Sequence, residues 1–297
     1  MYKEPFLKLI TDNKDKRFVT TDNYHTYFTI SDFRDQFDGL WSGGFHLFNS
    51  IVPLSNNCKI KNKSHHLPVI ESCFDNNLSL KFYLFKKSQG LLVSFINNNF
   101  MAKKVKRYSS FVKVSSQSNI MDIAEDSFIL KYDKPERLGF GFDNYYCAFL
   151  STGGYTFKDV SYKNSILNFN IIPTQDSLKE PEILILYSDG LAKLKKMIDY
   201  SKNKTTLLKK QHIKNSLLPF TYTSFETDNK TFDKALVWAT YSANGFVMRK
   251  NETIGLWAGL QWFDNSWGRD TFISLPGVSL VSGRYEEAKH IIVNFVK

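Results

Sequence analysis

The sequence has few cysteines and no long apolar run, and each of these missing features excludes a class of protein. Its 297 residues include only Cys58, Cys73 and Cys147, an odd and widely spaced set. Such a set excludes a disulfide framework and a zinc site of closely paired cysteines, so we expect three small buried side chains. No stretch reaches the roughly 18 consecutive apolar residues of a membrane span, and the start lacks the apolar core of a signal peptide. We therefore expect a cytoplasmic protein without a membrane partner.

Positive charge is in excess, with a formal net charge of +10. The lysines occur as dispersed pairs, such as Lys86 with Lys87 and Lys195 with Lys196, rather than in one block. Dispersed pairs are typical of a solvated surface, so we expect no nucleic-acid partner. The 26 Phe and 15 Tyr favour β structure and flat contact surfaces.

The first part of the chain has the alternating pattern of β-strands. From about residue 17 to 188, short runs with a period of two are separated by Asn, Asp, Gly and Ser clusters. A short loop ending at Gly90 joins two of these runs, which predicts a hairpin. Many strands without intervening helices favour a β-sandwich, which we assign to residues 1–187. The clearest strand candidates are residues 79–87, 90–99, 127–133, 165–172 and 182–188.

The pattern becomes helical after residue 188. Residues 188–228 carry a basic helical pattern and are predicted to form a linker helix. Residues 229–297 are predicted to be helical, except for a loop over residues 248–266. The helix that starts near Asp270 ends before Gly283, which is well placed as a C-terminal cap.

These C-terminal helices are too apolar to cover one another. The helix after Asp270 is apolar nearly all round and should be buried on every side. A last helix starts near Tyr285 and has an apolar face of its own. We therefore expect further helices, either from a second copy or, as we favour, from a longer chain of which this is the front part.

The most distinctive chemistry lies in "GLQWFDNSWGRDTFISLPG", residues 259–277. Aromatic faces stack against a sugar ring, and neighbouring polar side chains hydrogen-bond its hydroxyls. An alternative is that the tryptophans plug a helical bundle and that Asp270 only caps a helix. The candidate site residues are Trp257, Trp262, Asp264, Trp267, Arg269 and Asp270.

The run "WFDNSWGRDTFISLPGVSLVSGRYEEAKHII", residues 262–292, resembles the glycogen debranching amylo-α-1,6-glucosidase family. In that family a W-G-R-D-T run opens a helix, L-P-G bends it, and G-R-Y-E-E-A starts the next helix. Upstream, the resemblance is one of architecture and not of motif. It implies a β-sandwich followed by an (α/α)6 toroid, of which this chain holds the first helices. It also implies inverting hydrolysis of the α-1,6-linked glucose at glycogen branch points.

The resemblance implies that Asp270 is the general acid that protonates the leaving oxygen. Inversion also needs a carboxylate base about 6.5–9.5 Å away, which in the family comes from much later in the toroid. Asp264 and Glu252 are the weak alternatives here, and without a base we expect no hydrolysis. Adjacent His65 and His66 would face opposite sides of a strand, so they are expected at the surface and not as metal ligands.

We expect neither a cofactor nor a metal, and we expect glycogen or another branched α-glucan as the partner. Two other hypotheses stay open. The chain is either a non-catalytic glucan-binding remnant, or part of a related (α/α)6 glycoside hydrolase or phosphorylase that acts on another glucoside. The oligomeric state is left open.

Overall fold

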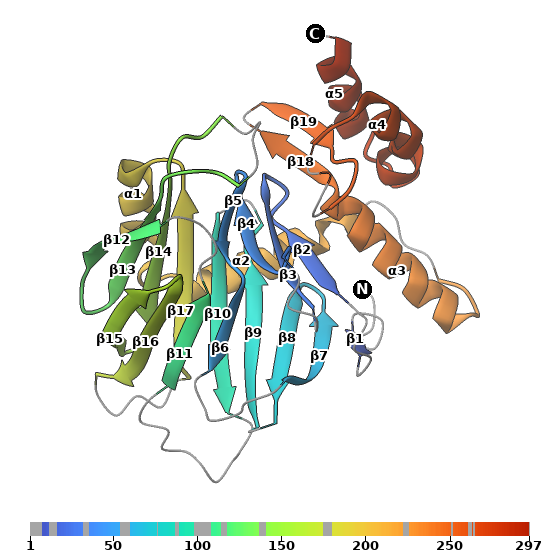
Figure 1. Cartoon of the computed structure of the whole chain (residues 1–297). Coiled ribbons are helices and arrows are strands. Elements are labelled where there is room, and N and C mark those ends of the chain that lie inside the picture. Colours follow the sequence, from blue (N-terminus) through green and yellow to red (C-terminus); the bar gives the residue numbers. More distant parts are fainter. Residues whose placement is uncertain are drawn as a thin grey trace.

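Antiparallel strands build the first part of the molecule, and helices follow toward the C-terminus (Figure 1). The structure is a computed structural model that describes most of the chain, but Cys58, Trp262 and Asp264 lie outside the described residues. The described segments are residues 8–11, 17–31, 36–53, 60–75, 77–86, 89–97, 108–113, 118–136, 141–174, 180–221, 226–250, 252–260, 263 and 265–296.

The largest sheet has nine strands in the order β1-β7-β8-β9-β10-β17-β14-β13-β12, and every neighbouring pair is antiparallel. The predicted hairpin is confirmed, because Leu84 pairs with Leu91 across β9 and β10. The strand bounds are β1 Lys8–Thr11, β7 Ile60–His66, β8 Val69–Phe74, β9 Leu78–Leu84, β10 Gly90–Asn97, β17 Glu182–Ser188, β14 Tyr145–Thr152, β13 Ser127–Tyr132 and β12 Ser118–Ile123.

Two smaller sheets pack on one face of this sheet and complete the predicted β-sandwich. Across the layers, the Phe28 and Phe82 ring centroids are 4.8 Å apart, and those of Phe128 and Phe157 are 4.9 Å apart. The many phenylalanines therefore fill the space between the layers. One small sheet contains β15 Tyr155–Lys163, β16 Ile166–Pro173, β11 Tyr108–Lys113 and β6 Ser50–Pro53, and the other contains β2 Phe18–Thr21, β3 Thr26–Ile30, β4 Gly39–Ser42 and β5 Phe45–Phe48.

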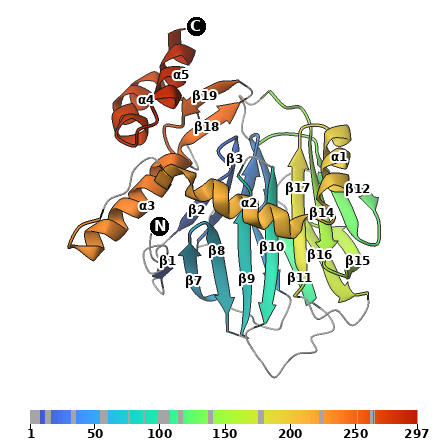
Figure 2. The ribbon, with the colours of Figure 1, turned by 180° about the vertical axis from the view of Figure 1, so that it is seen from behind.

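Two helices cover the opposite face of the large sheet (Figure 2). In β17, Ile183 and Ile185 point into the sandwich core, whereas Leu184 and Leu186 contact the helices, so this strand is buried on both faces. The segment predicted as a single linker helix is thus two helices that pack on the sheet. Their bounds are α1 Leu191–Ser201 and α2 Thr205–Leu217.

The C-terminal region is mainly helical, but part of the predicted loop over residues 248–266 is a β-hairpin. Val247 and Leu256 pack with the following helices, and this tertiary burial stabilises two strands too short to be recognised by their periodicity. The elements are α3 Lys230–Gly245, β18 Val247–Lys250, β19 Thr253–Leu256, α4 Gly268–Leu275, a π-helical turn Pro276–Leu280 and α5 Tyr285–Val296.

The end of the π-helical turn matches the prediction for Gly283. This residue has a φ of 72°, a conformation that glycine adopts without a steric penalty. The amide of Gly283 donates to the Leu280 carbonyl at 2.9 Å, and the amide of Arg284 donates to the Ser279 carbonyl at 2.8 Å. Both bonds satisfy carbonyl groups at the end of the helix.

The helix after Asp270 is not buried on every side in the described chain, which agrees with the expectation that these helices cannot cover one another. Ile273 is 74% exposed and Val281 is 68% exposed, and Phe272 and Leu280 are also exposed. Among the described residues, this apolar helix packs on the side where β19 and α5 contact it.

The expectation that His65 and His66 form a surface pair is also wrong for His65. Both residues lie on β7, but the His65 ring is buried against Phe18, Trp238 and Tyr241. Cys147 is buried as expected, and Cys73 is half-buried. Within the described segments, no helix combines the length and apolarity needed to cross a bilayer.

Candidate functional site

Asp270 lies in the first turn of α4, three residues after Trp267, whose extended backbone (φ −112°, ψ 133°) precedes the helix. The Trp267 side chain has no oxygen and cannot cap the first amide groups. Asp270 is the acidic residue of this turn, where the helix dipole favours negative charge. Its half-buried carboxylate forms no hydrogen bond or ion pair with the described residues. The carboxylate is therefore available to a ligand.

The two candidate residues near this carboxylate, Trp267 and Arg269, are both exposed to solvent. Trp267 is 56% exposed, so its ring offers an apolar face to solvent. Arg269 is exposed and forms no ion pair with Asp270 or with another described residue. Arg269 and Asp270, although adjacent in the sequence, therefore do not form a direct ion pair.

Trp257 has a different environment from Trp267. It is 8% exposed and packs with Tyr27, Trp41 and Met248, which joins the end of β19 to the small sheet of β2–β5. Trp257 thus anchors the segment before α4 to the β domain. The structure does not bring Trp257 and Trp267 into one exposed platform.

The chain between β19 and α4 is closed by a backbone bond and lies against the hairpin. The amide of Ala258 donates to the Asn265 carbonyl at 2.9 Å. A Cβ on Gly255 would lie 2.5 Å from Ser266 Oγ, so a larger residue here would force the Ser266 side chain to move. The tight loop places Trp267 and Asp270 directly after the hairpin.

A cavity of about 350 Å³ lies beside this loop. The β2–β3 turn contributes Tyr24 and His25, and the loop contributes Trp257 and Asn265. The ring of Phe295 from α5 closes another side. Burial lowers the pKa of His25 to about 4, so its imidazole is neutral at physiological pH. The β domain and the helices therefore build one concave surface next to Trp267.

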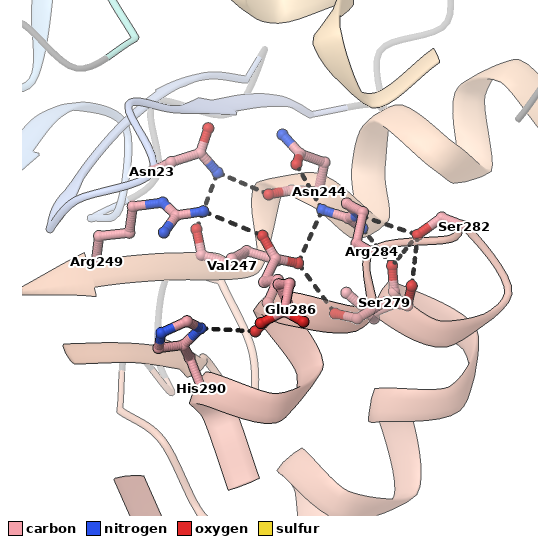
Figure 3. A network of polar contacts seen from close by, with 11 residues as sticks. Asn23, Asn244, Val247, Arg249, Ser279, Ser282, Arg284, Glu286 and His290 are labelled. Atoms are coloured by element: carbon pink, nitrogen blue, oxygen red, sulfur yellow. Dashed lines mark hydrogen bonds and ion pairs between the residues drawn. The ribbon is translucent and has the colours of Figure 1, made fainter. Parts of the chain in front are cut away.

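A partly buried ion-pair network joins α5 to the hairpin (Figure 3). Glu287 Oε1 lies 3.1 Å from Arg284 Nη1, and Glu287 Oε2 lies 3.2 Å from Arg249 Nη2. Ser279 Oγ donates to Glu287 Oε1 at 3.0 Å, and Asn244 Oδ1 accepts from Arg284 Nη1 at 2.9 Å. The network links α3, β18, the π-helical turn and α5 before any ligand is bound.

The β domain joins this network through Asn23 in the β2–β3 turn (Figure 3). Asn23 Nδ2 donates to the Asn244 carbonyl at 2.7 Å and to the Val247 carbonyl at 2.9 Å. Its own carbonyl accepts from the Arg249 amide at 2.9 Å. Three bonds from one residue thus fix the end of α3 and the start of β18 against the sandwich.

Sequence reasoning missed the roles of Arg284 and Glu287. By sequence, Glu287 is one of two carboxylates in the first turn of the last helix, where the helix dipole favours negative charge. The available signal was the G-R-Y-E-E-A run itself, where Arg284 and Glu287 are three residues apart and lie on the same side of a helix. Their structural pairing explains this part of the motif without a catalytic role.

Of the remaining candidates, those within the described residues do not form a second site. Trp262 and Asp264 fall outside the described residues. Glu252 lies exposed in the turn between β18 and β19. Across the described segments, no three His, Cys, Asp or Glu side chains gather in a way that could hold a metal ion.

Comparisons with known proteins agree with the resemblance. Residues 241–297 match the model of a family described as amylo-alpha-1,6-glucosidase. The match extends upstream of the quoted motif to the end of α3 and includes the β18–β19 hairpin.

Two solved structures are similar at low sequence identity. A bacterial glucoamylase complexed with acarbose has 11% identity and a TM-score of 0.49, over 94% of this chain and 49% of that one. A family GH92 alpha-mannosidase from Bacteroides thetaiotaomicron has 11% identity and a TM-score of 0.46, over 82% of this chain and 38% of that one. This chain spans less than half the length of either structure, and neither likeness establishes a function. What is established is that the C-terminal segment, residues 241–297, is similar to the amylo-alpha-1,6-glucosidase family.

Proposed function

We propose that this chain forms the β domain and the first catalytic helices of a glycogen debranching α-1,6-glucosidase. The observation that carries the proposal is the partner-free, half-buried carboxylate of Asp270 beside the exposed ring of Trp267. Both lie in the segment that resembles amylo-alpha-1,6-glucosidase. The exposed apolar surface of α4 supports further helices, as in an (α/α)6 toroid. We propose a cytoplasmic location from composition alone.

In the proposed reaction, Asp270 donates its proton to the glycosidic oxygen as the bond to the anomeric carbon breaks. A carboxylate base takes a proton from the water that attacks the opposite face, with about 6.5–9.5 Å between the two carboxyl groups. A general acid must keep its proton until the glycosidic bond breaks, and a bound substrate that excludes water from Asp270 would serve this role. Asp270 forms no ion pair with Arg269. The base is not assigned.

Glucan binding tests the proposal on the 297-residue chain. We expect a branched α-glucan oligosaccharide to change the tryptophan fluorescence in a saturable manner. Trp267→Ala should weaken this binding at least about tenfold, because one stacked ring is lost. Phe232→Ala is the matched control, since Phe232 is 52% exposed on α3, away from α4. Equal effects of both substitutions would refute a binding role for Trp267.

Hydrolysis tests the role of Asp270 in a protein that also contains the base. Asp270→Asn should reduce glucose release by about 10²–10⁴-fold, because general acid catalysis is lost, with glucan affinity retained. Asp199→Asn on the exposed side of α1 is the control and should have no effect. Full activity of Asp270→Asn would exclude Asp270 as the acid.

A second candidate function is glucan binding without hydrolysis. It is favoured by the exposed ring of Trp267 together with the lack of an assigned base among the described residues. Retained glucan binding and no glucose release, even in a longer protein, would support this candidate. Release of another sugar, or of a sugar phosphate, would instead support a related hydrolase or phosphorylase with a different glucoside.

A further inference from the structure

A second cavity, of about 680 Å³, is lined by α1, by the end of β17 and by the β2–β3 turn. Its volume is within the roughly 300–1,000 Å³ of small-molecule sites. Asp270 and Trp267 do not line it. Part of its lining is apolar and consists of Phe85, Leu186, Met197 and Leu208. The cavity therefore belongs mainly to the β domain and its two covering helices.

This cavity adjoins the 350 Å³ cavity beside Trp267. Tyr24, His25 and Lys250 line both cavities, so the two meet at the β2–β3 turn and the tip of the β18–β19 hairpin. The smaller cavity is also lined by Ser266, the residue directly before Trp267. A chain-like ligand bound at Trp267 therefore has a second concave surface within reach.

Three uncharged polar side chains that line the larger cavity have no protein partner. Ser201 is 5% exposed on the sheet-facing side of α1, and its hydroxyl forms no hydrogen bond to the described residues. The Gln89 amide and the Tyr24 hydroxyl also form none to that part of the chain. Such groups among apolar side chains orient a ligand that has hydroxyl groups of its own.

The lining also offers aromatic rings to a ligand. Tyr24 is half-buried and Tyr200 is 54% exposed. The ammonium group of Lys204 lies 3.6 Å from the Tyr200 ring centroid, which restrains this ring at the end of α1. An aromatic ring presents an apolar face, and the C–H face of a sugar ring stacks on such a surface.

The charged groups of the lining do not select an ion. Asp189 pairs with Lys193 at 3.3 Å, and Arg249 pairs with Glu287 at 3.2 Å. Lys196 is exposed to solvent. Paired charges between aromatic rings and free hydroxyl and amide groups favour a neutral ligand that is rich in hydroxyl groups.

We propose that this cavity binds the linear part of an α-glucan chain whose branch lies at Trp267, through Gln89, Tyr200 and Ser201. The inference rests on the proposed function, because that function supplies the glucan at Trp267. Contacts with the β domain then add to those of the branch, so a long chain binds more tightly than a short one.

Isothermal titration of the 297-residue chain with two branched ligands tests the length dependence. The short ligand is panose, and the long ligand is maltoheptaose that carries one α-1,6-linked glucose. We expect the long ligand to bind at least about tenfold more tightly, because it adds stacking and hydrogen bonds in the second cavity. Equal affinities would overturn the inference.

Two variants and a matched control locate the added binding. Gln89→Gly removes the amide at a backbone φ of 38°, which glycine adopts without strain. Combined with Tyr200→Ala, it should remove the advantage of the long ligand and leave panose binding unchanged. Asn164→Gly also removes an amide at positive φ (51°), but in the exposed β15–β16 turn, and should affect neither ligand. A length advantage that survives the double substitution would overturn the assignment of the cavity.

Trp267→Ala separates this inference from the proposed function. We expect it to weaken both ligands. Panose binding that depends on Trp267 but shows no gain with chain length would overturn this inference and leave the proposed function standing. Length-dependent binding that is lost in the double variant but unaffected by Trp267→Ala would support the cavity and contradict the role of Trp267. Lack of binding of both ligands would contradict both proposals.

Discussion

His65 shows at the residue scale how burial decides protonation. Burial lowers the pKa of His65 to about 3, and the positive charge of Lys86 acts in the same direction. The unfolded chain has the ordinary value of 6.5, so it binds a proton more readily than the folded chain. The contribution of His65 to stability is therefore complete above pH 6.5 and decreases as the pH falls toward 3.

Replacing this ring should make the protein less sensitive to acid. Between pH 7.5 and pH 5, His65 should account for about 2 kcal/mol of lost unfolding free energy. We expect His65→Phe to lose about that much less over the same interval, measured by urea unfolding at both pH values. His66→Gln, which changes the neighbouring half-buried ring, is the control. An unchanged pH dependence in His65→Phe would contradict the buried neutral state.

Asn23 combines a strained backbone with two side-chain bonds. Its φ is 65°, and its amide donates to the carbonyls of Asn244 and Val247. Asn23→Gly removes only the bonds and should lower the unfolding free energy by about 1–3 kcal/mol. Asn23→Ala should lower it by about 1 kcal/mol more, because alanine disfavours positive φ.

The control for this prediction is Asn77, which has a φ of 63° and no side-chain bond to the described residues. Asn77→Ala should cost only the backbone term of about 1 kcal/mol. If Asn23→Gly unfolds at the same urea concentration as the wild type, the β2–β3 turn does not stabilise the junction.

At the scale of elements, Glu287 holds α5 to the hairpin and to the π-helical turn. Its side chain is 11% exposed and pairs with Arg284, which is 7% exposed. Glu287→Gln should lower the unfolding free energy by about 3 kcal/mol, because it leaves two arginines without their carboxylate. The adjacent Glu286→Gln, in the same turn but exposed, should change it by less than about 0.5 kcal/mol. Chemical denaturation separates the two outcomes, and similar losses would contradict a role for the network.

The elements differ in how well sequence patterns predict them. The strands at 90–97 and 182–188 contain apolar runs at 91–93 and 183–187 and were correctly located. The hairpin of β18 and β19 was predicted as a loop, because four-residue strands show too little periodicity. The break between α1 and α2 was missed as well, since the basic pattern continues across it.

At the scale of the whole molecule, α4, the π-helical turn and α5 leave an apolar surface uncovered. Ile273, Val281 and Val296 are 74%, 68% and 81% exposed. Continuous exposed apolar surface favours association. We therefore expect the 297-residue chain to self-associate at micromolar concentrations, as measured by light scattering after size-exclusion chromatography.

A triple substitution tests the location of that surface. Ile273→Ser, Val281→Ser and Val296→Ser together should reduce the association, with little change in stability because the side chains are already exposed. Met121→Ser with Ile123→Ser removes exposed apolar groups from β12 and should leave the association unchanged. A monomeric wild-type chain would contradict the prediction.

The sequence by itself determined the β-sandwich, the positions of its main strands, the change to helices and the resemblance carried by residues 262–292. These features depend on local periodicity and on a dense motif, both of which are readable along the chain. Tertiary structure alone decided that Trp257 is buried while Trp267 is exposed, that His65 is buried, and that Arg284 and Glu287 form a network with Arg249. These outcomes depend on contacts between elements far apart in the sequence, and no local pattern encodes which surfaces meet.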